Sequence, residues 1–148
     1  MNYLVTAGPT REFIDDVRYI SNLSSGRMGY CIAEAAVAAG HRVVLVSGPV
    51  SLAPPPGAQA VQVISASEMY DAVLTRAAES DIIVMCAAVA DYRPAVRIRG
   101  KMKKGPDTLR IELTRTPDIL GELGRLNRQR ARRRPWLVGF ALEAEDPF

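Results

Sequence analysis

The sequence is poor in the residues on which metal and redox sites depend. It contains one histidine and two cysteines in 148 residues, and they do not form a group with the spacing of a zinc site. Cys31 and Cys86 fall in an expected helix and an expected strand, so we expect two small buried side chains rather than a disulfide. No apolar run approaches the length of a bilayer span, and no charged leader precedes an apolar N-terminal core. We therefore expect a cytoplasmic protein without membrane contact.

Two common phosphate-binding motifs are missing as well. The sequence has neither the Gly-x-Gly-x-x-Gly fingerprint of dinucleotide sites nor the Gly-Lys-Ser/Thr of a Walker loop. In their place, small residues fill 6–11, after an apolar strand, and 21–29, before an apolar helix. Serine hydroxyls and glycine amides at a helix N-terminus favour phosphate, because the free N–H groups and the helix dipole both attract an anion. The sequence therefore predicts a phosphate-binding entrance of another kind.

The apolar pattern predicts an α/β fold. Apolar residues make up 48% and charged residues 24% of the chain, the balance of an ordinary globular protein, and we expect one domain over residues 1–148. Strands that are apolar on both faces alternate with helices, which is typical of a parallel sheet covered on both sides. We expect a doubly wound, Rossmann-like, mainly parallel five-stranded sheet in the order 3-2-1-4-5. Its strands are expected at 2–6, 42–47, 60–64, 81–87 and 136–141.

Capping residues set the expected limits of the helices. We expect a helix over 29–40, a second helix capped by Ser67, and a third over 117–129 with Thr116 as its cap and Pro117 in first position. Residues 108–113 alternate between apolar and polar side chains. This alternation predicts one arm of a β-hairpin extension.

Positive charge is concentrated near the C-terminus. The formal net charge is +3, and much of it comes from Arg125, Arg128, Arg130, Arg132, Arg133 and Arg134. Such a run is typical of a solvated helix end, where cations interact favourably with the helix dipole, or of a nucleic-acid patch. No aromatic side chains alternate with these arginines, as they do where bases stack. We therefore expect no nucleic-acid partner.

A ligand site is expected at the carboxyl ends of the parallel strands, next to the point where the strand order reverses. Four segments reach that edge of the expected sheet, namely 7–9, 21–29, 86–93 and 140–143. Tiny side chains in 86–90 let a flat ring or a phosphate approach the backbone. The Asp91 carboxylate either holds a ribose hydroxyl or Mg²⁺, or only caps a turn before Pro94.

Two further polar features each allow two interpretations. The lysines of 101–104 suit a triphosphate beside an anion site, or they form a solvated surface loop. Asn22 either favours a turn or supplies a donor and an acceptor to an acyl group.

Six motifs occur in order along nearly the whole chain: GPTREFIDDVRYISNLSSGRMG, LVSGPV, AAVADYRP, KMKK, TPDIL and VGFALE. Together they resemble the phosphopantothenate–cysteine ligase family, commonly the C-terminal half of a bifunctional flavoprotein of coenzyme A biosynthesis. The resemblance implies that CTP (or ATP), with Mg²⁺, activates 4′-phosphopantothenate to an acyl-nucleotidylate, which the amine of cysteine then attacks. It also implies a homodimer and a flavin-dependent decarboxylase as partner.

The resemblance also assigns roles to single residues. It implies that Asn22 contacts the acyl intermediate and supports the cysteine step, and that Lys101, the first lysine of the family's KxKK motif, is catalytic. Asp91 is the implied metal ligand. The implied nucleotide contacts are Gly8, Ser24, Ser25, Gly26, Cys86, Ala87, Ala88, Asp91, Lys101, Lys104, Pro117, Asp118, Ile119, Leu120 and Phe140.

Three features depart from the family pattern. Thr116 stands where the family commonly has asparagine, and Glu143-Ala144 replaces Glu-Thr. The family domain continues beyond the position of Phe148, so we expect a ligase domain that is incomplete at its C-terminus. A second hypothesis follows from this departure: a catalytically degenerate module that keeps the fold and binds a nucleotide without turnover.

Overall fold

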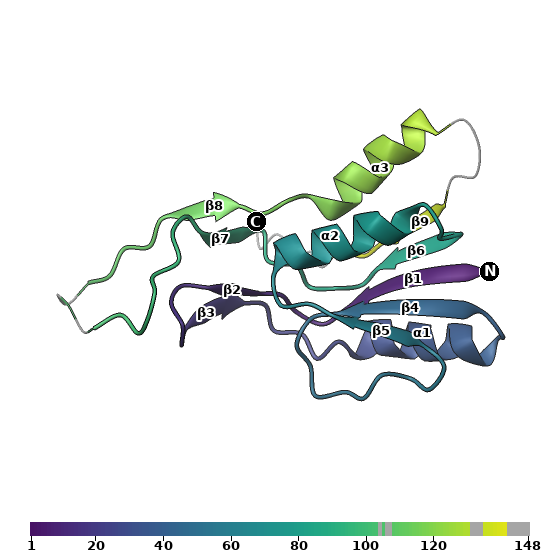
Figure 1. The fold of residues 1–148 in the computed structure, drawn as a ribbon, viewed down its shortest axis with the longest axis horizontal. Helices are drawn as coiled ribbons and strands as arrows, with labels where there is room; N and C mark the ends of the chain where they lie inside the picture. The colour runs from purple at the N-terminus through teal and green to yellow at the C-terminus, as the bar shows by residue number, and fades with distance from the viewer. Residues whose placement is uncertain (104, 106–107, 131–134, 142–148) are drawn as a thin grey trace, which may run out of the picture.

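The computed structural model describes residues 1–103, 105, 108–130 and 135–141. Five parallel strands form a sheet in the order β5-β4-β1-β6-β9 (Figure 1). They are β1 (Asn2–Ala7), β4 (Arg42–Ser47), β5 (Gln59–Gln62), β6 (Ile82–Met85) and β9 (Trp136–Gly139). Counted along the chain, these core strands stand in the order 3-2-1-4-5. The expected doubly wound, Rossmann-like topology is therefore confirmed.

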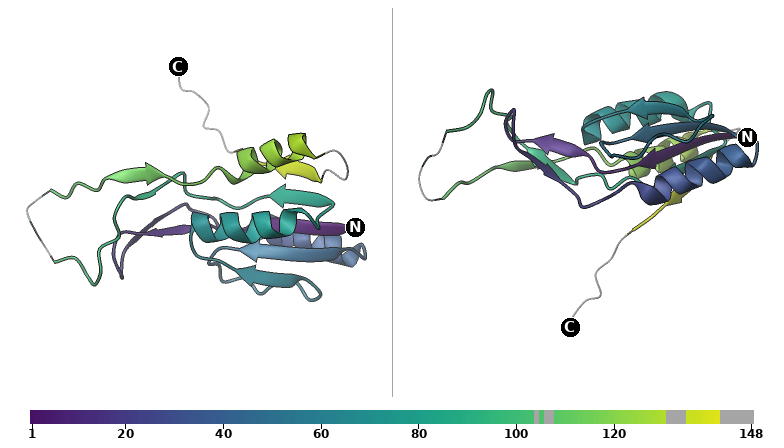
Figure 2. Two further views of the ribbon diagram at one scale, coloured as in Figure 1. Left: turned by 45° about the horizontal axis from the view of Figure 1, so that its top comes forward. Right: turned by 90° about the horizontal axis from the view of Figure 1, so that it is seen from below.

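Helices cover both faces of this sheet (Figure 1, Figure 2). They are α1 (Arg27–Ala38) on one face and α2 (Ala66–Ala77) and α3 (Ile119–Gln129) on the other. Leu4 of β1 packs with Met69 of α2 in one core cluster, whereas Val5 packs with Ala33 of α1 in the other. Successive side chains of a strand point to opposite faces. The continuous apolar character of β1 is thus explained by burial on both sides.

Two helices begin at residues other than those expected. α1 begins at Arg27 instead of residue 29, and its N-cap is Gly26, whose φ of 76° is left-handed. Ser67 is not the cap of α2. The cap is Ser65, whose Oγ accepts the N–H of Glu68 at 3.2 Å, while the Glu68 carboxylate accepts the N–H of Ile64 at 2.8 Å. This pair is a variant of the capping box in which Glu68 reaches the residue before the N-cap, and its cap lies two residues earlier than expected.

The expected cap of α3 is also wrong. Asp118 is the N-cap, and its carboxylate accepts the N–H of Gly121 at 2.8 Å. Thr116 is used elsewhere, because its hydroxyl donates to the carbonyl oxygen of Ala90 at 2.6 Å. Pro117 therefore lies before the helix rather than in its first turn.

Two short antiparallel hairpins project from the carboxyl edge of the sheet (Figure 1). One pairs β2 (Arg11–Phe13) with β3 (Tyr19–Ser21), and the other pairs β7 (Tyr92–Pro94) with β8 (Leu113–Arg115). A hairpin extension is confirmed, although its paired arm lies at 113–115 instead of 108–113. The β2–β3 hairpin was not expected, because strands of three residues are too short to show a period.

The two cysteines occupy different environments. Both are free thiols, but Cys31 is exposed, contrary to expectation, because the buried stripe of α1 runs through Tyr30, Ala33 and Ala36. Cys86 directly follows β6 and is half-buried, and this burial raises the pKa of its thiol. In the part of the chain that the structure describes, no helix has the length and apolar character needed to cross a bilayer.

Candidate functional site

Four glycines allow the backbone to cross itself at the carboxyl ends of β1 and β4. We call Gly8, Gly26, Gly29 and Gly48 the glycine crossing. A Cβ on Gly26 would lie 3.1 Å from the nitrogen of Gly8, and one on Gly29 would lie 2.6 Å from the Cβ of Ala7. A Cβ on Gly48 would overlap the carbonyl oxygen of Pro9. These positions need glycine because another backbone segment occupies the space of a side chain.

The N-terminus of α1 opens at this crossing. The Oγ atoms of Ser24 and Ser25 accept the N–H groups of Gly26 and Arg27, at 3.3 and 3.4 Å. The next two amides of a first helical turn have no acceptor inside the helix. No acidic residue lies in the first turn of α1, so its dipole and amides present an uncompensated positive end. This arrangement is suited to binding a phosphate.

Asn22 joins this loop to the segment after β6. Its Nδ2 donates to the carbonyl oxygens of Ala88 and Val89, at 3.2 and 3.0 Å. The N–H of Ala88 in turn donates to the carbonyl oxygen of Gly8 at 2.9 Å. An amide group that faces two carbonyl oxygens must present its nitrogen, so the acceptor Oδ1 of Asn22 is directed away from them. The structure thus brings together Gly8, Asn22, Gly26 and Ala88.

Three threonines hold the segment after β6 in place, and the sequence interpretation missed two of them, Thr6 and Thr10. Their fully buried hydroxyls accept the N–H groups of Ala87 and Ala90, at 3.1 and 3.0 Å. Thr116 completes the set through its bond to the carbonyl oxygen of Ala90. A sequence signal existed, because Thr6 lies at the end of an apolar strand and Thr10 in the small-residue segment that follows it.

Asp91 follows this segment with an exposed side chain. Its carbonyl oxygen accepts the N–H of Thr116 at 2.9 Å. No group of three or more Asp, Glu, His or Cys side chains that could hold a metal occurs among the residues described. One carboxylate suits a Mg²⁺ ion that takes most of its ligands from phosphates and water, but not a metal held by the protein alone.

The remaining nucleotide contacts implied by sequence lie around α3 and β9. Ile119 is 4% exposed and packs in the core, so its side chain faces away from solvent. Asp118 and Leu120 are exposed, and a Cβ on Gly139 would lie 2.6 Å from Cδ2 of Leu120. Pro117 is half-buried, and Phe140, directly after β9, is 54% exposed. These residues lie at the same carboxyl edge of the sheet, on the side of β9 and α3.

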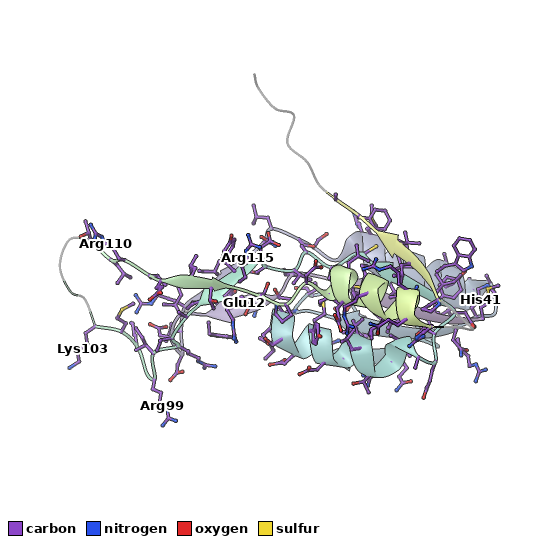
Figure 3. All side chains as sticks on the ribbon, turned by 90° about the horizontal axis from the view of Figure 1, so that it is seen from above. Glu12, His41, Arg99, Lys103, Arg110 and Arg115 are labelled. Carbon is purple, nitrogen blue, oxygen red and sulfur yellow. The ribbon has the colours of Figure 1, made fainter. Side chains whose placement is uncertain are left out.

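Lys101 lies between β7 and β8, in the segment of residues 95–103 and 108–112 that we call the extension and that projects beyond the carboxyl edge of the sheet (Figure 1). It is exposed, and Figure 3 shows the neighbouring Lys103 at the end of the molecule opposite to His41. No hydrogen bond or ion pair of the described residues joins Lys101 to the crossing. Lys104 lies outside the described residues.

The arginine run is partly neutralised. Arg125 forms an ion pair with Glu122 at 2.6 Å, and these hydrogen bonds hold the pKa of the Glu122 carboxyl below its ordinary value. Arg132, Arg133 and Arg134 lie outside the described residues.

Comparison with known proteins gives a consistent result. A family model described as the DNA/pantothenate metabolism flavoprotein C-terminal domain matches residues 1–148. The coenzyme A biosynthesis bifunctional protein CoaBC of Vibrio vulnificus (strain YJ016) is 50% identical over 145 residues, which cover 97% of this chain and 35% of that protein. CoaBC of Bacillus subtilis (strain 168) is 50% identical over 144 residues, covering 97% and 34%. The chain therefore spans about a third of the length of these relatives.

Solved structures agree with this match. The crystal structure of the C-terminal domain of CoaBC superposes with a TM-score of 0.81 at 46% identity, covering 98% of this chain and 66% of that chain. The DNA/pantothenate metabolism flavoprotein from Streptococcus pneumoniae gives a TM-score of 0.79 at 24% identity, covering 93% and 67%. The second similarity, at its lower identity, supports the fold alone.

Proposed function

The chain belongs to the DNA/pantothenate metabolism flavoprotein C-terminal domain family, and from this premise we propose that it acts as a phosphopantothenate–cysteine ligase. The observation that carries the proposal is the meeting of Gly8, Asn22, Gly26 and Ala88 at one sheet edge. There, phosphate-binding amides lie beside a side chain that can contact an acyl group. The names of the relatives, proteins of coenzyme A biosynthesis, support the choice of substrates.

In the first half-reaction, the carboxylate of 4′-phosphopantothenate attacks the α-phosphorus of CTP, and pyrophosphate leaves. The amides at the start of α1 and the glycine crossing bind phosphate oxygens, and the charge of Lys101 is directed at the triphosphate. ATP is the alternative nucleotide. Mg²⁺, held with the help of Asp91, would neutralise phosphate charge.

In the second half-reaction, the amine of cysteine forms the new C–N bond at the acyl carbon. The nucleoside monophosphate leaves, and the amine loses a proton to solvent. Asn22 serves this step in one of two ways. Its Oδ1 can accept an N–H of the attacking amine, or its Nδ2 can leave the carbonyls of Ala88 and Val89 and donate to the acyl oxygen.

The Asn22→Asp variant tests this assignment. It removes both donations to the 88–89 backbone and adds a negative charge where the carbonyl oxygen gains charge, so we expect amide formation to slow by roughly 10²- to 10³-fold. Nucleotidyl transfer should slow much less. With radiolabelled CTP, 4′-phosphopantothenate and cysteine, single-turnover assays should show release of pyrophosphate and accumulation of the acyl-nucleotidylate. The matched control is Gln129→Glu, the same amide-to-acid change at the exposed end of α3, which should behave like the wild type.

Two outcomes would contradict parts of this proposal. If pyrophosphate release and product formation fell together without an intermediate, Asn22 would act in the first step or in the fold. If the wild-type chain bound CTP and released no pyrophosphate, it would be a nucleotide-binding module without catalysis.

We further propose that the chain works as a homodimer, beside a flavin-dependent decarboxylase. The word bifunctional in the names of the relatives supports a second activity in the longer proteins. Light scattering of the purified chain measures its oligomeric state, and a monomer at micromolar concentration would contradict the proposed homodimer.

A further inference from the structure

The turn between β2 and β3 contains a carboxylate that the ligase chemistry does not use. Asp15 is completely buried. Its Oδ1 accepts the N–H groups of Val17 and Arg18, at 2.8 and 2.7 Å, and its Oδ2 accepts the guanidinium Nε of Arg18 at 2.9 Å and a second bond from Nη2. A buried carboxylate with this many donors is an organising group rather than a surface charge.

The same turn holds the residues on both sides of Lys101. The N–H of Met102 donates to Oδ2 of Asp15 at 3.1 Å, and the carbonyl oxygen of Met102 accepts from Nη2 of Arg18 at 3.0 Å. The N–H of Gly100 donates to Oδ2 of Asp16 at 2.7 Å, and its carbonyl oxygen accepts the N–H of Asp16 at 3.2 Å. Four hydrogen bonds therefore hold the backbone before and after Lys101 against residues more than eighty positions earlier in the chain.

Asp15 and Asp16 contribute differently to this contact. The hydrogen bonds from Arg18 hold the pKa of the Asp15 carboxyl far below its ordinary value, against the opposing effect of burial. Asp15 is therefore ionised at neutral pH. Asp16 is half-exposed and pairs with the exposed Arg97 at 3.0 Å. Because Asp15 itself is buried, loss of its charge would leave the donors that face it without an equivalent acceptor, whereas water can replace the half-exposed Asp16.

We propose that Asp15 is the positioning residue for Lys101, which it fixes relative to the β2–β3 hairpin through Met102 and Arg18. A lysine on a backbone that is already ordered loses less conformational freedom when it binds a phosphate. The proposal rests on the proposed function in one respect, namely that Lys101 binds the triphosphate.

The test uses the whole 148-residue chain and three variants: Asp15→Asn, its neighbour Asp16→Asn as matched control, and Lys101→Ala. Hydrogen exchange, measured without nucleotide, reports the protection of the Gly100 and Met102 amides. Calorimetry compares the affinities for CTP and CMP. For Asp15→Asn we expect faster exchange at Met102 and a roughly three- to tenfold loss of CTP affinity, with CMP affinity unchanged. For Asp16→Asn we expect both affinities to stay within twofold of the wild type.

The double variant Asp15→Asn/Lys101→Ala separates positioning from stability. If Asp15 acts through Lys101, the double variant should bind CTP no more weakly than Lys101→Ala alone. Additive losses, or equal losses for CTP and CMP, would overturn the proposal. If Lys101→Ala itself left CTP affinity unchanged, the proposed role of Lys101 would fail. Hydrogen exchange would still show whether Asp15 orders this backbone.

A second variant covers the case in which Asp15→Asn does not fold. Met102→Pro removes the N–H that reaches Asp15 and leaves the other donors of Asp15 in place. It should reproduce the selective loss of CTP affinity, whereas Gly105→Pro, three residues further on and without the loss of a charge, should not. Equal effects of the two proline variants would contradict a specific role for the bond between Met102 and Asp15.

Discussion

The glycine crossing and the extension are held together by opposite means. At the crossing, backbone segments approach each other because side chains are absent, as at Gly48 beside Pro9. Outside the sheet, residues 14–18 of the β2–β3 turn and residues 97–102 of the extension are joined by charged side chains, with Asp15 and Arg18 at the centre. The first kind of contact leaves backbone amides open to a ligand. The second places a charged loop at a defined position beyond the sheet.

This difference determines how each kind of contact responds to salt and to amino-acid substitution. Steric contacts between neutral backbone groups depend little on ionic strength, whereas the exposed pair of Asp16 and Arg97 is screened by salt. An added methyl group should therefore cost more at the crossing than in the extension. Removal of a charge should weaken ligand binding when it is made in the extension and should have little effect at the crossing. Four substitutions test this comparison.

The largest effect is expected for Gly48→Ala. The new Cβ would overlap the carbonyl oxygen of Pro9, and the backbone cannot yield without separating β1 from β4. We expect the free energy of unfolding to fall by about 3 kcal/mol, measured by urea denaturation. Gly105→Ala is the control, because no atom lies within 4 Å of its Cβ position. Equal midpoints for the two variants would show that the crossing is not tightly packed.

Next in size is the effect of Lys101→Ala on nucleotide binding. A lysine that is directed at phosphates contributes about 1.5–3 kcal/mol through charged hydrogen bonds. We expect CTP binding to weaken by that amount and CMP binding to change little, by calorimetry. Arg99→Ala removes an equal charge from the same extension (Figure 3) and should affect neither ligand. Equal losses for CTP and CMP would make Lys101 a surface residue.

A smaller effect is expected for Gly100→Ala, the counterpart of Gly48→Ala in the extension. Gly100 has a φ of 75°, but nothing lies within 4 Å of its Cβ position. Only the left-handed backbone is penalised, which costs about 1–2 kcal/mol. Urea denaturation should show a loss clearly below that of Gly48→Ala. A loss of the same size would contradict the distinction between steric and conformational cost.

The smallest effect is expected for Asp16→Asn, and it should depend on pH. The N–H of Gly100 and then the side chain of Arg97 lower the pKa of the Asp16 carboxyl from its ordinary value of 3.8. A lowered folded-state pKa means that the stabilisation is present above pH 3.8 and is lost as the pH falls below it. Thermal melts should show a slightly lower midpoint for the variant at pH 7. The difference should vanish in acid, and a constant difference would exclude the carboxylate as its cause.

The sheet could be predicted from the sequence because its signal is local. β1 is apolar over residues 3–5 and β4 over residues 43–46, without polar alternation, and burial on both faces requires this pattern. The close approach of backbone segments at Gly8 and Gly26 was also predictable, since it needs small residues before the helix. The β2–β3 hairpin was missed, because three paired residues carry no measurable period.

Helix caps were predicted less well than the helices themselves. Ser65 and Ser67 both precede the apolar positions of α2, and the choice depends on where Glu68 can reach back to Ile64. Thr116 has the right chemistry for a cap, but its hydroxyl donates to the carbonyl oxygen of Ala90 instead. Residue propensity identifies the residues that can cap a helix, and contacts with neighbouring segments determine which of them does so.

The sequence by itself determined the parallel sheet, the two helical layers and the glycines of the crossing. Each of these follows from a pattern within a few residues, because periodicity and small size act locally. Only the tertiary structure decided that Asn22 faces the backbone of Ala88, and that Asp15 reaches Met102. Those contacts join segments 66 and 87 positions apart. Nothing in the local chain can specify them, because their energy arises only after folding has buried Asp15 and brought the loops together.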